Sequence, residues 1–308
     1  MLRKIAENIN RAPEFVGTMQ YNISMREHTS FRVGGPAEIF ITPMSQHSFL
    51  FVIHYLQNTQ QNYVVLGQGS NIVVSDKGIS GFVISTAGLD SIEYKTDTKE
   101  LRCGAGCTFE KITQFCIENS LSGIEAFAGL PGSVGGAVFM NARCYNCSIS
   151  DILVATKYVN KKGSLSYYTM NNKDWAYKTS PFNTSLYGTS VITAHFSVRE
   201  GNQNEIQNKS TTSIENRRKK GHYTFPSAGS VFKNNRAFGK PSGQLIDEAG
   251  LKGTTCGGAQ VAPWHGNFIV NTGTATADDI KKLVEQVTQE VLRQTGFELE
   301  CEIIFYGD

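Results

Sequence analysis

The chain has 308 residues, 40% hydrophobic and 18% charged, which is typical of a folded globular protein rather than a disordered one. Because 29 Lys and Arg nearly balance 27 Asp and Glu, no basic surface for nucleic acid is expected. No apolar run has the length of a membrane span, and seven cysteines show no disulfide framework, so we expect a cytoplasmic protein with reduced thiols.

The first part of the chain predicts a strand, a helix and a second strand in succession. Residues 38–42 are typical of a strand and residues 45–58 of a helix. Tyr63 to Leu66 form an apolar run of strand length that leads directly into Gly67. We therefore expect a βαβ unit that presents a glycine turn at the end of its second strand.

A second unit of strands and a helix is expected next. Residues 79–84 and 101–103 predict short strands, and Thr108 is well placed to cap a helix whose apolar residues share one face. This helix should end near Asn119, shortly before a second glycine-rich segment. Three further strands are predicted, and they lie at 152–160, 165–170 and 191–198.

The composition turns polar between residues 200 and 209, where we place a domain boundary. Residues 277–295 then predict a helix, with Thr276 and Asp279 spaced as a capping pair and Gly296 as the stop signal. Residues 298–305 predict a closing strand. Its period of two places four apolar residues on one face and turns Glu300 and Glu302 to the other.

Two glycine-rich loops are the main candidates for ligand binding. One is Gly67-Gln68-Gly69-Ser70-Asn71, and the other runs from Gly129 to Gly136 with four glycines in eight positions. Glycine permits positive φ and removes Cβ atoms, so several main-chain N–H groups can converge on one anion such as a pyrophosphate. Neither loop reads as a P-loop or as a Rossmann glycine turn.

Ser230 follows a glycine and precedes an apolar pair, so its hydroxyl can point into a cleft. The surrounding residues do not form the nucleophile elbow of a serine hydrolase, and we interpret Ser230 as a proton donor. His265, the nearest base in sequence, is more typical of a hydrogen-bonded structural histidine. Cys144 and Cys147 form a lone CxxC, which favours two loop thiols over a zinc or redox site, and no metal ligand is assigned.

Five motifs in this order resemble the UDP-N-acetylenolpyruvoylglucosamine reductase family over most of the chain, from about Tyr21 to Gly307. They are Thr29 to Ala37, Leu66 to Asn71, Gly123 to Ala142, Pro226 to Asn234 and His265 to Asn271. The resemblance implies an α+β flavoenzyme with the two-subdomain FAD-binding fold of vanillyl-alcohol oxidase and p-cresol methylhydroxylase. It implies FAD-binding subdomains at residues 1–85 and 86–200 and a C-terminal α+β substrate domain at residues 201–308.

The resemblance implies noncovalent FAD as cofactor, with NADPH as co-substrate. It assigns the cofactor to residues of the two loops, namely Leu66, Gly67, Gln68, Gly69, Ser70, Asn71, Ile72, Gly129, Pro131, Gly132, Ser133, Gly135, Gly136 and Ala137. The expected reaction is a hydride relay from NADPH through FAD to C3 of the enolpyruvyl sugar nucleotide, which yields UDP-N-acetylmuramate for peptidoglycan synthesis. Ser230 matches the proton donor of the family, and Glu302 matches the glutamate that polarises the substrate carboxylate.

Three residues depart from the family pattern, and each removes a positive charge or changes its shape. Lys178 stands where the family has a catalytic arginine, so the charge remains but the planar fork that binds a carboxylate is lost. We retain Lys178 as the cation beside the carboxylate, and Arg143 is a second candidate. Ile304 replaces an arginine and Trp264 a lysine. The short segment after Phe182 indicates the shorter, type II-like form of the family.

Other functions compete with this interpretation. The altered or lost cationic residues at the three positions above favour a different FAD-dependent oxidoreductase of the same fold. The retained Ser230 and Glu302 disfavour it. A flavin-binding module without catalysis is a second alternative, and it predicts bound FAD without NADPH-dependent turnover. A metal hydrolase is disfavoured, because the six histidines show no ligand spacing.

Overall fold

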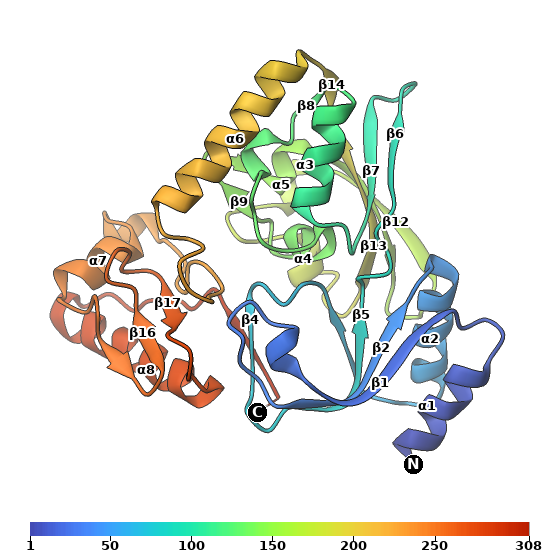
Figure 1. Ribbon diagram of the computed structural model, residues 1–308, viewed down its shortest axis with the longest axis horizontal. Coiled ribbons are helices and arrows are strands. Elements are labelled where there is room, and N and C mark those ends of the chain that lie inside the picture. The colour runs from blue at the N-terminus through green and yellow to red at the C-terminus, as the bar shows by residue number, and fades with distance from the viewer. Residues whose placement is uncertain (308) are drawn as a thin grey trace. The chain divides into compact units, whose positions relative to one another are not determined.

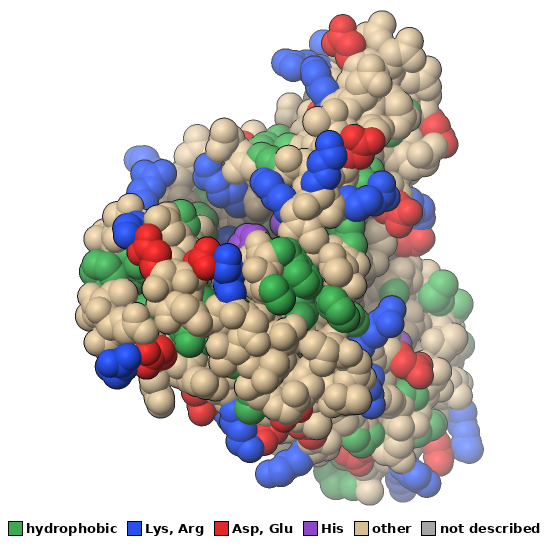
Figure 2. Space-filling view, turned by 60° about the vertical axis from the view of Figure 1, so that its left-hand side comes forward, with side chains coloured by type: hydrophobic (Ala, Val, Ile, Leu, Met, Phe, Trp, Pro, Cys, Tyr) green, Lys and Arg blue, Asp and Glu red, His purple; other side chains and the backbone are tan. Residues whose placement is uncertain are grey.

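The computed structural model describes residues 1–307 (Figure 1). The chain forms two compact units, and both are discontinuous in sequence. The first unit consists of Met1–Tyr21, Ile39–Gln68 and Gly81–Glu215, and the second of Asn22–Glu38, Gly69–Ser80 and the chain from Asn216 on. Acidic and basic side chains are interspersed on the face drawn in Figure 2, as the small net charge predicts. Within residues 1–307 no helix has both the length and the apolar character needed to cross a membrane.

A four-stranded sheet belongs for the most part to the first unit, with strand order β1-β2-β5-β3. Its strands are β1 (Gly17–Ser24), β2 (Pro36–Pro43), β5 (Ile79–Ser85) and β3 (Tyr63–Leu66), with β3 and β5 parallel. Two helices, α1 (Leu2–Arg11) and α2 (Gln46–Asn58), bury their apolar residues against this sheet. The Ser45 hydroxyl caps α2 by accepting a hydrogen bond from the Ser48 amide at 3.1 Å. The strand–helix–strand prediction is therefore confirmed, and β3 delivers the chain to Gly67.

The second sheet of this unit is antiparallel and has five strands. Its order is β12 (Leu165–Thr169), β11 (Leu153–Val159), β13 (Ser190–Ser197), β7 (Glu100–Gly104) and β6 (Ile92–Lys95). Helices α3 (Phe109–Glu118) and α4 (Val134–Phe139) share an apolar core with its central strands. Thr108 caps α3 by accepting from the Lys111 amide at 3.1 Å, as predicted. The sheet and α3 thus support the glycine-rich segment that begins α4.

Shorter elements complete the first unit. They are β8 (Leu121–Ser122), which pairs with β14 (Arg199–Glu200), the hairpin of β9 (Arg143–Cys144) and β10 (Cys147–Ser148), α5 (Ile149–Ile152), and the 3₁₀ turns Glu125–Phe127, Asn172–Asp174 and Pro181–Asn183. The polar segment after Glu200 forms helix α6 (Gln203–Lys219), and the split between the two units falls inside this helix, after Glu215. The division into three consecutive domains stays a prediction.

The second unit is built around one apolar core. Its elements are the 3₁₀ turns Met25–Glu27 and Arg236–Phe238, β4 (Ile72–Val74), α7 (Ser242–Glu248), the antiparallel strands β15 (Thr255–Cys256), β16 (Ala259–Val261) and β17 (Ile269–Asn271), α8 (Ala277–Thr295) and β18 (Ile304–Tyr306). Strand β18 runs parallel to β4, with Ile304 opposite Ile72. The unit therefore joins an early segment of the chain to its last strand.

Helix α8 has the predicted bounds and the predicted caps. The Thr276 hydroxyl accepts from the Asp279 amide at 3.0 Å, the Asp279 carboxylate accepts from the Thr276 amide at 3.0 Å, and Gly296 ends the helix with φ of 75°. Asp76, in the loop after β4, also caps this helix. Its carboxylate accepts hydrogen bonds from the amides of Ala277 and Asp278 at 2.9 and 3.0 Å. Asp76 thereby fixes the start of α8 against the loop that follows β4.

Replacing Asp76 with alanine should therefore destabilise the second unit. The change leaves two amides at the positive end of α8 without their carboxylate, and losing an N-cap of this kind costs about 1–2 kcal/mol. Thermal unfolding followed by circular dichroism should show a lower midpoint. The adjacent exposed Lys77→Ala is the matched control and should leave the midpoint unchanged; equal midpoints for the two variants would contradict the capping role.

The closing strand differs from its prediction. Regular pairing covers only Ile304 to Tyr306, and the residues before it form a single bridge, between Cys301 and Phe232. The two glutamates flank this bridge: the Lys233 amide donates to the Glu300 carbonyl at 2.8 Å, and the Glu302 amide donates to the Val231 carbonyl at 2.7 Å. They differ in burial, since Glu302 is 8% exposed and the Glu300 side chain is 71% exposed. Two residues after Glu302 the partner changes, because the Ile304 amide donates to the Asn71 carbonyl at 3.0 Å, and the segment does not continue as one regular strand.

Candidate functional site

In the first unit, the two predicted loops meet at Gly67. An added Cβ on Gly67 would lie 2.3 Å from the Ser133 hydroxyl oxygen and 4.0 Å from the Gly136 nitrogen. Real Cβ atoms do not approach other atoms as closely as 2.3 Å, so only glycine leaves the Ser133 hydroxyl in place. The structure thus brings together the end of β3 and the start of α4, as a cradle shared by both loops requires.

The second loop has the backbone geometry that its glycines permit. Gly129 and Gly132 have φ of 71° and 126°, values that side chains disfavour. The amides of Val134 and Gly135 donate to the carbonyls of Cys107 and Ala105 at 2.9 and 2.8 Å, which anchors the loop to the chain before α3. These two amides are used internally, which leaves those of Gly132 and Ser133 as the candidate donors to an anion.

The remaining predicted loop residues differ in exposure. Leu66, Gly132, Ser133 and Ala137 are buried, and Gln68, Pro131 and Gly136 are exposed. The Ser133 hydroxyl also caps α4, accepting from the Gly136 amide at 3.5 Å. Ser133 is therefore the residue through which a change at Gly67 reaches the second loop.

Replacing Gly67 with alanine should reduce the flavin content of the purified protein several-fold. The new methyl group displaces the Ser133 hydroxyl and breaks the cap of α4, whose loss costs about 1 kcal/mol. The ratio of flavin to protein absorbance measures the effect. In the double variant Gly67→Ala with Ser133→Ala the nearest side-chain approach becomes 3.5 Å, an ordinary contact. The double variant should therefore lose no more flavin than Ser133→Ala alone, because both lack the cap and neither has the clash. A double variant whose loss equals the sum of the two single losses would contradict this account.

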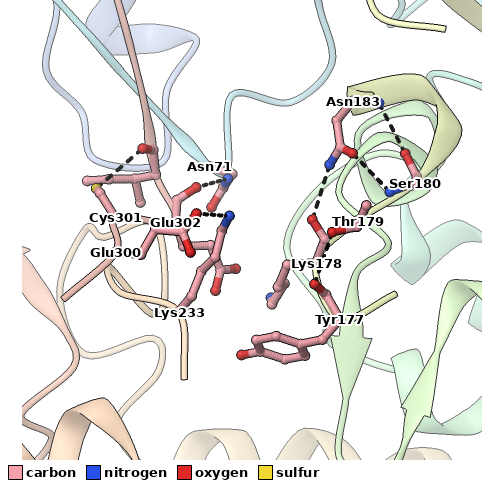
Figure 3. Close-up of polar contacts among 11 residues, drawn as sticks. Asn71, Tyr177, Lys178, Thr179, Ser180, Asn183, Lys233, Glu300, Cys301 and Glu302 are labelled. Carbon is pink, nitrogen blue, oxygen red and sulfur yellow. Dashed lines mark hydrogen bonds and ion pairs between the residues drawn. The ribbon is translucent and has the colours of Figure 1, made fainter. Parts of the chain in front are cut away.

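Lys178 lies in a tight turn of the first unit (Figure 3). Ala176 and Thr179 pair across the turn, with N–H···O distances of 3.2 and 3.0 Å, and Lys178 itself has φ of 57°. The Lys178 carbonyl accepts from the Asn183 side-chain amide at 3.2 Å. Its ammonium lies 6.0 Å from the centre of the Tyr177 ring. The hydrogen bonds of the turn thus hold the backbone of Lys178 in a left-handed conformation that a non-glycine residue adopts only when its surroundings impose it.

The turn is anchored to α4, the helix that begins at the second glycine loop. The Ser180 hydroxyl donates to the Phe139 carbonyl at 2.7 Å, and the Asn141 side chain donates to the Ala176 carbonyl at 2.8 Å. Asn141 and Asn183 were not singled out from the sequence, because an amide that buttresses a turn has no spacing of its own. Lys178 and the second loop are thereby coupled within one unit.

In the second unit, the loop from Gly69 to Ile72 supports the segment that carries Glu302. Gly69 has φ of 61°, and an added Cβ would lie 2.1 Å from the His28 carbonyl oxygen. The Asn71 side chain donates to the Glu302 carbonyl at 3.0 Å, and Ile72 begins β4 (Figure 3). Asn71, predicted as a cofactor residue, is thus also a backbone support for Glu302.

Ser230 and Glu302 lie on adjacent segments of the second unit. Gly229 turns the chain with φ of 74° directly before Ser230, which is half-buried. One residue further on, the Val231 carbonyl accepts from the Glu302 amide at 2.7 Å. The family resemblance assigns Ser230 and Glu302 to one catalytic site. The hydrogen bond between the Glu302 and Val231 main chains places the two residues on neighbouring segments.

Asn267 positions the segment after Ser230, and sequence reasoning did not find it. Its backbone carbonyl accepts from the Val231 amide at 2.9 Å, and its side chain both accepts from the Phe232 amide at 2.9 Å and donates to the Phe232 carbonyl at 2.8 Å. The Asn267 amide in turn donates to Nδ1 of His265 at 3.2 Å. His265 is thus a hydrogen-bonded structural residue, and burial lowers its pKa, so the ring is neutral at pH 7.

One charged pair borders this region. The Lys233 ammonium donates to the Glu300 carboxylate at 2.5 Å (Figure 3), and the Glu300 side chain is largely exposed. An exposed pair of this kind contributes about 0–1 kcal/mol to stability. Its importance lies in its position, because Lys233 follows the Asn267-bound segment and places a positive charge three residues after Ser230.

Comparison with protein families agrees with this geometry. The FAD-binding domain family matches residues 37–166, and the C-terminal domain of UDP-N-acetylenolpyruvoylglucosamine reductase matches residues 221–306. The glycine loops that meet at Gly67 lie within the first match, and Ser230 and Glu302 lie within the second. The chain is therefore a flavin-dependent oxidoreductase with an FAD-binding domain, which confirms the predicted fold class and cofactor.

The relatives identify the family more closely. The chain is 47% identical over 305 residues to UDP-N-acetylenolpyruvoylglucosamine reductase of Treponema denticola, with 95% of this chain and 94% of the relative covered. It is 38% identical to the reductase of Treponema pallidum, covering 93% of each chain. A crystal structure of the Thermus caldophilus reductase is 30% identical, with a TM-score of 0.78 over 95% of this chain and 99% of that one. The chain belongs to the UDP-N-acetylenolpyruvoylglucosamine reductase family.

Proposed function

We propose that the protein uses NADPH to reduce UDP-N-acetylenolpyruvoylglucosamine to UDP-N-acetylmuramate, a cytoplasmic step of peptidoglycan synthesis. Membership of the reductase family over nearly the whole chain supports the substrate. The observation that carries the proposal is the pairing of Ser230 with Glu302 through the Val231 carbonyl, because this reaction needs a proton donor beside a group that acts on a carboxylate.

The glycine loops fit the pyrophosphate of FAD. Their closest approach leaves no room for a side chain at Gly67, and the amides of Gly132 and Ser133 remain for an anion. When bound, FAD supplies hydride transfer between NADPH and C3 of the substrate. Two turns built on glycine can approach a phosphate more closely than turns with side chains, which supports binding of the pyrophosphate by main-chain amides.

Ser230 is the proposed proton donor to C2 of the substrate. Hydride arrival at C3 shifts an electron pair toward C2 and its carboxylate, and a proton must then form the new C2–H bond. The Ser230 hydroxyl gives that proton as its O–H bond breaks, which is general acid catalysis. The hydrogen bonds of Asn267 to Val231 and Phe232 hold the backbone directly after Ser230 and so fix the position from which its side chain projects.

Glu302 and Lys178 are the proposed groups that act on the substrate carboxylate. The negative charge that develops there during hydride transfer is stabilised by a cation that is already oriented, and such preorganised charge is worth more than a mobile one. Lys178 is the candidate for this cation, since Asn183 and contacts to α4 fix the backbone of its turn. Glu302 is 8% exposed, and its burial favours a catalytic role over that of a solvated carboxylate.

The test is an NADPH oxidation assay with purified, flavin-loaded protein. We expect NADPH absorbance to fall only when the enolpyruvyl sugar nucleotide is present, with UDP-N-acetylmuramate as the product by mass spectrometry. Oxidation of NADPH that consumes oxygen and ignores the sugar nucleotide would instead identify another flavin-dependent oxidoreductase. Bound FAD with no turnover in either condition would identify a binding module.

A further inference from the structure

Two exposed aromatic rings of the second unit lie face to face. Phe225 and Trp264 are 40% and 38% exposed, their ring centroids are 6.0 Å apart, and their planes differ by only 18°. Exposed Tyr223 lies on the same short connection between α6 and Ser230. Hydrophobic side chains are gathered beside histidine and basic side chains on the face shown in Figure 2. Large rings left open to solvent in parallel are typical of a surface that receives another planar group.

The chain is shaped to hold the indole in place. Gly221 has φ of 72°, and an added Cβ would lie 2.3 Å from Nε1 of Trp264. Any side chain at position 221 would therefore push the ring away from its present position. The backbone next to Phe225 is also fixed, because the carbonyl of the following residue, Pro226, accepts a hydrogen bond from the Asn271 amide at 2.9 Å. The two rings are presented by fixed backbone rather than by free loops.

The surroundings combine this apolar surface with positive charge. His222 and His265 adjoin the two rings in sequence and pack on Phe268, with ring centroids 4.8 and 4.4 Å from that of Phe268. Burial, with smaller contributions from the positive charges of Arg217 and Lys220, lowers the pKa of His222 to about 4. Both imidazoles are therefore neutral at pH 7, and the positive charge near the rings comes from Arg217 and Lys220. A flat ring that carries phosphate groups is the chemistry that matches such a surface.

The aromatic pair is connected to the proposed proton donor. Ser230 and Phe268 pair as an antiparallel bridge, and Phe268 contacts His265, the residue next to Trp264. The connection lies wholly inside the second unit, which carries Ser230 and Glu302 and, of the two glycine loops, only the part from Gly69 to Asn71. The molecule that this unit must orient is therefore the sugar nucleotide whose C2 receives the Ser230 proton.

We propose that Phe225 and Trp264 form a stacking platform that holds the pyrimidine base of the sugar nucleotide substrate. The inference rests on the proposed function and deepens it by naming the residues that recognise the nucleotide end. At position 264 the family pattern has a lysine, so this chain replaces a charged contact by a stacking one. Lys220, which is exposed and acts electrostatically on His222 and His265, supplies the positive charge for the diphosphate.

The test uses the intrinsic fluorescence of Trp264. The chain has two tryptophans, so Trp175→Phe leaves Trp264 as the single indole. In this flavin-loaded background, UDP should quench the fluorescence in a saturable way, and ribose 5-phosphate, which has no base, should not. Trp264→Leu, measured by calorimetry, should raise the Kd of UDP about tenfold, because stacking of a base on an aromatic ring contributes about 1–3 kcal/mol. Trp264→Phe should restore most of the affinity.

Kinetics supply the second readout. Trp264→Leu should raise KM for the sugar nucleotide about tenfold and leave KM for NADPH and the flavin content unchanged. Tyr167→Leu, a matched change at an exposed ring of the first unit, should alter none of these values. If an active Trp264→Leu enzyme kept its UDP affinity and its KM for the sugar nucleotide, the proposed platform would be wrong. It would also be wrong if NADP⁺, but not UDP, quenched the Trp264 fluorescence. Loss of the proposed function would appear separately, as a wild-type protein that does not oxidise NADPH when the sugar nucleotide is added.

Discussion

Ser230→Ala is expected to lower turnover by about 10²–10⁴-fold, the usual contribution of a positioned general acid. Alanine keeps the backbone hydrogen bonds of Val231 and Phe232 to Asn267, so the segment retains its path while the proton donor is removed. Hydride donation by NADPH does not involve this proton. Rapid mixing under anaerobic conditions should therefore show normal bleaching of the flavin by NADPH and slow recovery of its colour when the sugar nucleotide is added.

Two further variants make this test specific. Ser227→Ala removes a hydroxyl three residues upstream on the same connection and should leave both phases unchanged. Ser230→Cys keeps a proton on the side chain and should retain more turnover than alanine does. If Ser230→Ala recovered its colour at the rate of the unaltered protein, Ser230 would not be the donor, and the proton would have to come from water or Glu302.

Lys178→Met is expected to reduce turnover by about 10²–10³-fold, as the loss of one preorganised electrostatic contact does in other enzymes. Methionine has a similar length and must adopt the same backbone φ of 57°, so the comparison isolates the charge. Lys178→Arg keeps the charge and adds the planar fork, and it should match or exceed the activity of the unaltered protein. Steady-state kcat of the three proteins gives the comparison.

The control for this series is Lys173→Met, which removes an exposed charge from the 3₁₀ turn Asn172–Asp174 nearby. It should leave kcat unchanged. Near-normal turnover in Lys178→Met would remove Lys178 from the mechanism. Arg143, exposed on β9, would then be tested by Arg143→Ala as the alternative cation.

Elements set by local interactions could be predicted from the sequence. Helix α8 has the predicted bounds because its signals are within one turn of each end, namely the Thr276 and Asp279 cap and the Gly296 stop. Strand β3 and its glycine turn, and the Thr108 cap of α3, were predictable for the same reason. The family resemblance added what no local signal contains, the FAD-binding fold and the cofactor.

Features that depend on distant partners could not be predicted. The assignment of residues 22–38 and 69–80 to the second unit rests on contacts with residues more than 150 positions later, for which neither segment has a pattern. The segment that carries Glu302 pairs first with Val231 and then with Asn71, and both partners lie far away in the sequence. Asn267 acts through hydrogen bonds across 35 residues, and a single asparagine in an apolar segment gives no sign of them.

The pairing of β18 with β4 has a consequence for biosynthesis. Ile304, Phe305 and Tyr306 complete a ladder that residues 72–74 begin, so those early residues leave the ribosome long before their partner is made. The second unit can close only after residues 304–306 have cleared the exit tunnel. A chain that stops before Ile304 would consequently be released with its apolar Ile72–Val74 edge open to other chains, a form prone to aggregate.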